Sequence, residues 1–81
     1  MRDEIMRAKG RLSEARHKQL QLSLEGKGLI ALVRNLLDPY EPDLARLRIP
    51  EARANMDRLA AVHEEIRLVD EQIASLEADL G

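Results

Sequence analysis

The stretch DPYEPDLARLRIP, residues 38–50, decides the fold because it contains all three prolines of the chain. Proline lacks a backbone N–H and clashes with the preceding turn, so helix interiors exclude it. Pro50 followed by Glu51 suits the first turn of a helix, where proline is tolerated and a carboxylate stabilises the positive end of the dipole. Asp43 is placed to cap one short turn within the stretch. We therefore predict a connection over residues 38–49 between two long helices.

The segment before this connection has the spacing of a coiled-coil helix. Apolar residues recur at alternating steps of three and four, and only Gln19 and Gly26 are not apolar. We predict a helix over about residues 2–37. The positions are Ile5, Ala8, Leu12, Ala15, Gln19, Leu22, Gly26, Leu29, Val33, Leu36 and Tyr40.

The segment after the connection follows the same rule, and we predict a helix over about residues 50–80. Asn55 is its one polar position, and an inward-facing asparagine can set the register of a coiled coil. The positions are Ala52, Asn55, Leu59, Val62, Ile66, Val69, Ile73, Leu76 and Leu80.

Gly26 and Gly28 are the weak point of the first predicted helix. Each costs about 1 kcal/mol in a helix interior relative to alanine, and together they could end the helix and leave a three-helix protein. The three-four spacing continues from Leu22 to Leu29 without a shift, which a loop would have no reason to preserve. We therefore predict a continuous helix, with a kink or a close approach of the other helix at Gly26.

The composition agrees with a rod, because 35% of the residues are charged and Tyr40 is the only aromatic residue. The predicted helices would be about 54 and 46 Å long. A compact globule of this size has a radius of gyration of only about 12 Å. The predicted fold class is all-α, an antiparallel two-helix hairpin resembling a coiled coil, with one domain over residues 1–81.

Charge is divided between the two predicted helices. Residues 1–37 carry eight Lys or Arg and four Asp or Glu, whereas residues 50–81 carry three and eight. An antiparallel hairpin places the basic end of one helix beside the acidic end of the other, and opposite charges at flanking positions favour that pairing. The facing groups would be Arg2, Arg7, Lys9, Arg11, Arg16 and Lys18 on one helix and Glu64, Glu65, Asp70, Glu71, Glu77 and Asp79 on the other.

Apolar residues around positions 29–37 exceed what a single seam covers, and Leu20 and Leu24 also lie off that seam. A wide apolar arc is typical of a helix that contacts two or more neighbours. We expect a homodimer in which two hairpins form a four-helix bundle, with higher oligomers or a surface for a different protein as alternatives. The expected oligomer interface comprises Leu22, Leu29, Ile30, Leu32, Val33, Leu36, Leu37, Leu59, Val62, Ile66 and Val69.

The apolar residues of the connection suggest two roles. Tyr40, Leu44, Leu47 and Ile49 either cap the open end of the core or form a rigid tip that binds a partner protein. We favour the cap, because a hairpin core needs closing at its turn.

No pattern of residues indicates catalysis, and we expect a non-enzyme without metal or cofactor. His63-Glu64-Glu65 lacks the second histidine that a zinc metalloprotease helix carries. The carboxylates of the second helix lie off its inward positions, unlike those of ferritin-like di-metal sites. His17 and His63 do not meet across the hairpin, and His63 falls opposite Glu25, which would make an ordinary surface pair.

The basic cluster between Arg2 and Lys18 is the one feature that suggests nucleic acid. Acids are interleaved with it, an acidic helix lies beside it, and no aromatic side chain is available for base stacking. We expect a solvated face with internal pairing and no nucleic-acid binding. An accessory protein that binds nucleic acid through this face is the alternative function.

The chain, with LVRNLLDPYEPD at residues 32–43 and IASLEADLG at residues 73–81, resembles small uncharacterised helical proteins of Mu-like transposable phages and prophages. The resemblance implies a phage accessory protein that binds and modulates a host or phage protein. It implies no role for any single residue. The start MRDEIMRAKG has no apolar signal segment and no stretch approaches 18 apolar residues, so we expect a cytoplasmic protein.

Overall fold

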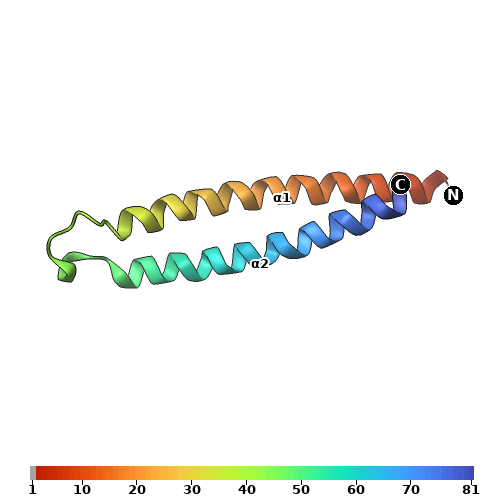
Figure 1. The fold of residues 1–81 in the computed structure, drawn as a ribbon. Coiled ribbons are helices and arrows are strands. Elements are labelled where there is room, and N and C mark those ends of the chain that lie inside the picture. Colours follow the sequence, from red (N-terminus) through yellow and green to blue (C-terminus); the bar gives the residue numbers. More distant parts are fainter. Residues whose placement is uncertain (1) are drawn as a thin grey trace.

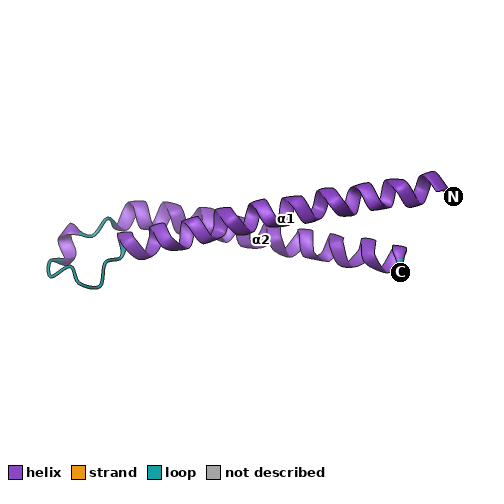
Figure 2. Cartoon of the chain, turned by 90° about the horizontal axis from the view of Figure 1, so that it is seen from above, coloured by secondary structure: helices purple, strands orange, loops and turns teal. Residues whose placement is uncertain are grey.

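The computed structural model describes residues 2–81, which form two long helices, α1 (Arg2–Leu36) and α2 (Ile49–Leu80). The connection holds one 3-10 turn, η1 (Leu44–Arg46), and the described residues contain no strand. Figures 1 and 2 show the helices running antiparallel, with the connection at one end and both termini at the other. The molecule measures 65 × 15 × 14 Å with a radius of gyration of 18.4 Å. The all-helical, rod-shaped hairpin is therefore confirmed.

Polar side chains of the connection close its own turns. The Asp38 carboxylate accepts a hydrogen bond from the Tyr40 backbone N–H at 2.9 Å, and Asp43 accepts one from Ala45 at 3.0 Å. Asp43 thus caps η1 as expected, and Pro50 lies in the first turn of α2. Both bonds join residues within the connection itself.

The core is a single seam between α1 and α2. The residues at the predicted three-four positions are buried or half-buried from Ala8 to Leu36 and from Ala52 to Leu80. Val62 is the one large side chain that is almost fully enclosed, at 1% exposure. The two outermost predicted positions lie outside the seam, because Ile5 and Tyr40 are exposed. The buried apolar residues are Leu12, Ala15, Leu22, Val33, Ala52, Val62 and Val69.

Helix α1 runs through Gly26 and Gly28 without a break. Gly26 is buried in the seam, where a methyl group in place of its hydrogen would lie 3.6 Å from Val62 and 3.9 Å from Leu59. These are ordinary van der Waals distances, so α2 packs over Gly26 but leaves room for alanine. Gly28 points away from α2, and nothing lies within 4 Å of the corresponding position.

We predict that Gly26→Ala and Gly28→Ala each stabilise the hairpin by about 1 kcal/mol, because alanine is the better helix former and neither site is crowded. For a domain of this size that corresponds to a rise in Tm of about 4–8 °C. Thermal unfolding followed by circular dichroism measures both variants. A loss of stability in Gly26→Ala alone would show that the seam is tighter at Gly26 than the distances indicate.

Candidate interaction surfaces

One side of the hairpin is apolar in the half nearest the connection. We call this side the turn-proximal face and define it by Ile30, Leu37, Ile49 and Met56, which are 44–48% exposed. Residues seven apart share one side of a helix. Ile30 and Leu37 therefore form one row at the end of α1, and Ile49 and Met56 form one row at the start of α2. Leu37 continues the helix geometry, since its N–H donates to Val33 at 3.0 Å.

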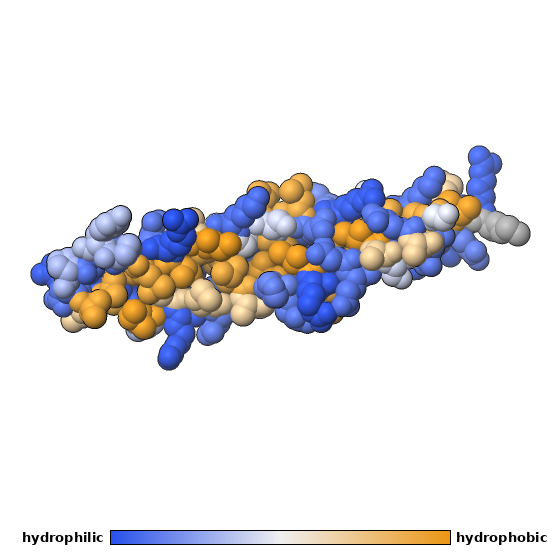
Figure 3. All heavy atoms as spheres, in the orientation of Figure 1, coloured by the Kyte–Doolittle hydropathy of each residue, from blue (hydrophilic) through white to orange (hydrophobic). Residues whose placement is uncertain are grey.

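These two pairs lie on the same side of the hairpin. The ion pair between Arg16 and Glu77 marks that side farther along the rod. Leu37 is three heptads from Arg16, and Met56 is three heptads from Glu77, so both residues lie on the side of that ion pair. Figure 3 shows apolar side chains gathered over both helices in this half of the molecule. The result is an uncovered apolar face spanning α1 and α2.

The opposite side of the hairpin carries side-chain ion pairs and, near its end, contacts with the connection. Arg58 donates two hydrogen bonds to the Glu25 carboxylate, at 2.6 and 2.8 Å, and lies 3.8 Å from Glu65. Nearer the end, Leu47 of the connection lines a shallow hollow with Leu32 and Leu36 of α1. Leu32 remains 43% exposed on this side, whereas the turn-proximal face has four apolar residues of similar exposure.

The contact between Glu25 and His63 that the sequence allows does not form. The two residues lie at similar levels, but the Glu25 carboxylate binds Arg58 instead. His63 is one heptad from both Met56 and Asp70, so it belongs to the apolar side of the hairpin. In an antiparallel hairpin, residues equally far from the turn lie at the same level, but this spacing does not determine on which side of the seam each residue lies.

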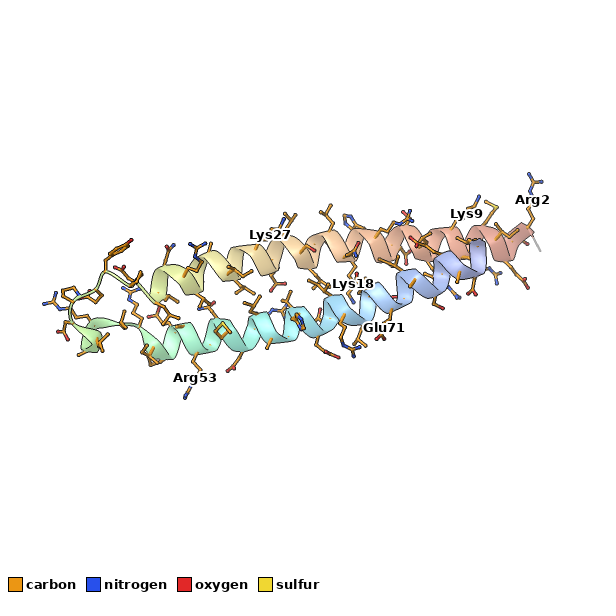
Figure 4. All side chains as sticks on the ribbon, viewed as in Figure 1. Arg2, Lys9, Lys18, Lys27, Arg53 and Glu71 are labelled. Atoms are coloured by element: carbon orange, nitrogen blue, oxygen red, sulfur yellow. The ribbon has the colours of Figure 1, made fainter. Side chains whose placement is uncertain are left out.

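Few ion pairs join the basic and acidic ends. Arg16 binds Glu77 at 2.8 Å, and it is the only cation of the cluster from Arg2 to Lys18 that pairs with a described carboxylate. Within α2, Arg67 binds Glu64 at 2.8 Å and Glu71 at 2.6 Å. Arg67 thus engages two carboxylates of α2, while residues 50–81 keep their excess of acids over basic residues. Figure 4 shows Arg2 and Lys9 pointing away from α2.

The expected cap over the core is wrong for two of its four residues. Tyr40 is 89% exposed and Leu44 is 76% exposed. The reason is local, because the Asp38 and Asp43 bonds hold this segment in its own turns and do not fold it over the seam. Leu47 is half-buried, and Ile49 begins α2 on the turn-proximal face.

The residues expected at an oligomer interface fall into three groups by exposure. Those at the centre of the seam already pack against the other helix of the same chain, so contact with a second copy stays a prediction for them. The expected interface did not include Ile49 and Met56. Their spacing of seven residues places both on one side of the helix, next to the row that contains Leu59, and could have indicated an apolar flank. Leu22, Val33, Val62 and Val69 are buried, Leu29, Leu36, Leu59 and Ile66 are half-buried, and Ile30, Leu32 and Leu37 are exposed.

Within residues 2–81, no group of three or more histidine, aspartate or glutamate side chains is arranged to hold a metal ion. None of the described helices combines the length and the apolarity needed to cross a bilayer. Comparison with known proteins gives no match, whether to a family model, a curated sequence or a solved structure.

The Glu25–Arg58 pair predicts how stability depends on pH. The hydrogen bonds from Arg58 lower the pKa of Glu25 below its ordinary value, and those from Arg67 lower the pKa of Glu64. A carboxyl with a lowered folded pKa stabilises the fold above its unfolded pKa, and this contribution is lost as the pH falls through the folded pKa.

We therefore expect the free energy of unfolding to fall as the pH is lowered below about 4. Arg58→Gln should be less stable at pH 7 and should lose less on acidification, because Glu25 no longer has its partner. Urea unfolding at pH 7 and pH 3 measures this difference. Arg53→Gln is the matched control, since Arg53 pairs with no described carboxylate, and an equal change in both variants would contradict the assignment.

Proposed function

We propose that this chain is a non-enzymatic, cytoplasmic protein-interaction module that works as a homodimer, with two hairpins forming a four-helix bundle through their turn-proximal faces. The observation that supports it best is the uncovered apolar face of Ile30, Leu37, Ile49 and Met56. A monomer would leave these side chains in water on one side of a core that is only one seam deep.

The surface area supports the same conclusion. The chain exposes 6564 Å² for a mass of 9.2 kDa. A compact monomer of that mass exposes about 4,900 Å², so the excess is roughly 1,600 Å². A standard protein–protein interface buries about 1,600 Å² in total, shared between its two partners. A single hairpin therefore has ample surface to contribute to such an interface.

The test is the mass of the protein in solution, measured by sedimentation equilibrium or light scattering. We expect twice the chain mass of 9.2 kDa. Ile30→Glu and Met56→Glu should each shift the protein to monomer, because they would bury an unpaired charge in the interface. Leu24→Glu is the matched control, since Leu24 is 62% exposed and lies on the outer side of α1.

A wild-type protein that stays a folded monomer over a wide concentration range would contradict the proposal. Circular dichroism at each concentration shows whether the glutamate variants remain helical. If Leu24→Glu also dissociates the protein, the interface lies elsewhere on α1.

The resemblance to Mu-like phage proteins stays a prediction, and with it the expectation that the dimer binds a host or phage protein. The exposed Tyr40 and Leu44 support a binding role for the tip, since they do not cap the core. Affinity purification from the native host, compared between wild type and a Tyr40→Ala, Leu44→Ser double variant, tests this role. A partner retained equally by both would remove the tip from the proposal.

The second candidate function is binding of nucleic acid by the basic end of α1. It is favoured by one observation, that Arg2, Arg7, Lys9, Arg11 and Lys18 pair with no described carboxylate. If it holds, affinity for DNA should fall steeply with added salt, because phosphate contacts release counterions. Fluorescence anisotropy with single- and double-stranded DNA measures it, with Arg7→Ala, Arg11→Ala as the weakened variant. Absence of binding at low salt would exclude this function.

A further inference from the structure

We propose that the two copies of this chain pack antiparallel, with only their turn-proximal halves overlapping and their terminal halves extending in opposite directions. The inference rests on the proposed homodimer and adds its orientation. It follows from where the apolar face stops along the rod.

This side of the hairpin changes from apolar to polar about halfway along its length. On α2 a single row at seven-residue spacing is apolar at Ile49 and Met56 and then becomes polar. The same side carries the Gln19–Asp70 hydrogen bond and the Arg16–Glu77 ion pair in the terminal half. Apolar contact is therefore available near the connection, and polar contact beyond it. The row is Ile49, Met56, His63, Asp70 and Glu77.

A two-fold axis along the rod would place the hairpins parallel, so the whole of one face would cover the whole of the other. That arrangement would take the Gln19–Asp70 and Arg16–Glu77 pairs out of water. Removing charged groups from water costs several kcal/mol per ion unless new partners replace the solvent. Each hairpin would bring the same two pairs to the interface, and these groups already bind each other within one chain. The second copy would therefore supply no new partner for them.

A two-fold axis across the rod avoids this cost. The midpoint of Ile30 and Leu37 falls between residues 33 and 34, and the midpoint of Ile49 and Met56 falls between residues 52 and 53. These midpoints lie at nearly the same level, because Gly26 faces Leu59 and Val62 across the seam. One axis can therefore pass through both.

Rotation about that axis brings apolar residues together on both helices. Ile30 of one copy lies over Leu37 of the other, and Ile49 lies over Met56. Each contact occurs twice, as a two-fold interface requires. The terminal halves, with their charged pairs and the basic cluster, stay in water at opposite ends of the dimer.

The two orientations differ in length. From Arg2 to Val33 α1 extends about 47 Å, so the antiparallel dimer would be about 95 Å long. A parallel dimer would keep the 65 Å length of one hairpin. Small-angle X-ray scattering of the wild-type protein measures this maximum dimension directly.

Disulfide mapping gives the residue-level test, because the chain has no cysteine of its own. Three single variants are made, Ile30→Cys, Leu37→Cys and Met56→Cys. An equal mixture of the first two should form a covalent dimer under mild oxidation, while a mixture of Ile30→Cys with Met56→Cys should not. Disulfides need Cα atoms within about 7 Å, so each mixture reports one orientation.

The outcomes separate the orientation from the homodimer itself. Cross-linking of the Ile30→Cys and Leu37→Cys mixture with a length near 95 Å supports the inference. Cross-linking of the Ile30→Cys and Met56→Cys mixture with a length near 65 Å overturns it and leaves the homodimer standing. A dimer by mass with neither cross-link overturns it as well, since the face would then be unused. A monomer by mass overturns the homodimer and the orientation together.

Discussion

The structure depends on one constraint, which is that two helices share only one seam. Each helix presents a narrow apolar stripe to the other, and the packing of Val62 over Gly26 lies at the middle of that contact. A third layer that could enclose the remaining apolar side chains does not exist within the described chain. Stability must therefore come from a row of small contacts along the rod, with few side chains removed completely from water.

A single seam also leaves two flanking sides, and in this hairpin one side is mainly ionic while the other is apolar near the connection. On one side, Arg58 bridges Glu25 and Glu65 while Leu47 of the connection packs near Leu32 and Leu36. On the other, Ile30 is 47% exposed and Leu37 is 44% exposed, although Leu37 also lines a hollow with Pro39 and Tyr40. The ionic side has satisfied partners and gains nothing from association. The apolar side gains from any surface that excludes water, and this asymmetry is the reason for placing the proposed dimer contact there.

The seam could be predicted from the sequence because helix periodicity is a local property. Two proline-free segments with three-four spacing identify both helices and the residues that face inward. On α1 these residues are buried or half-buried from Ala8 to Leu36. The sides of the hairpin could not be predicted in the same way. Which flank a charged residue reaches depends on the rotation of both helices about their axes, so the sequence allowed a contact of Glu25 with His63, whereas Glu25 binds Arg58. The exposure of Tyr40 was missed because the three-four spacing continues to residue 40, whereas α1 ends at Leu36 and the Tyr40 N–H donates to Asp38 in a turn of the connection.

A rod with one apolar half and one charged half can separate two tasks along its length. Self-association would occupy the half near the connection, where Ile30 and Met56 lie, and would leave the basic end of α1 unchanged. The two candidate functions are then compatible, because their surfaces share no residue. An antiparallel dimer would carry a basic end at each extremity, and two linked sites bind a long partner far more tightly than one when the spacing matches. The distance between those ends would then be set by the position at which the apolar face stops, and so by the residues that follow Met56 in its row.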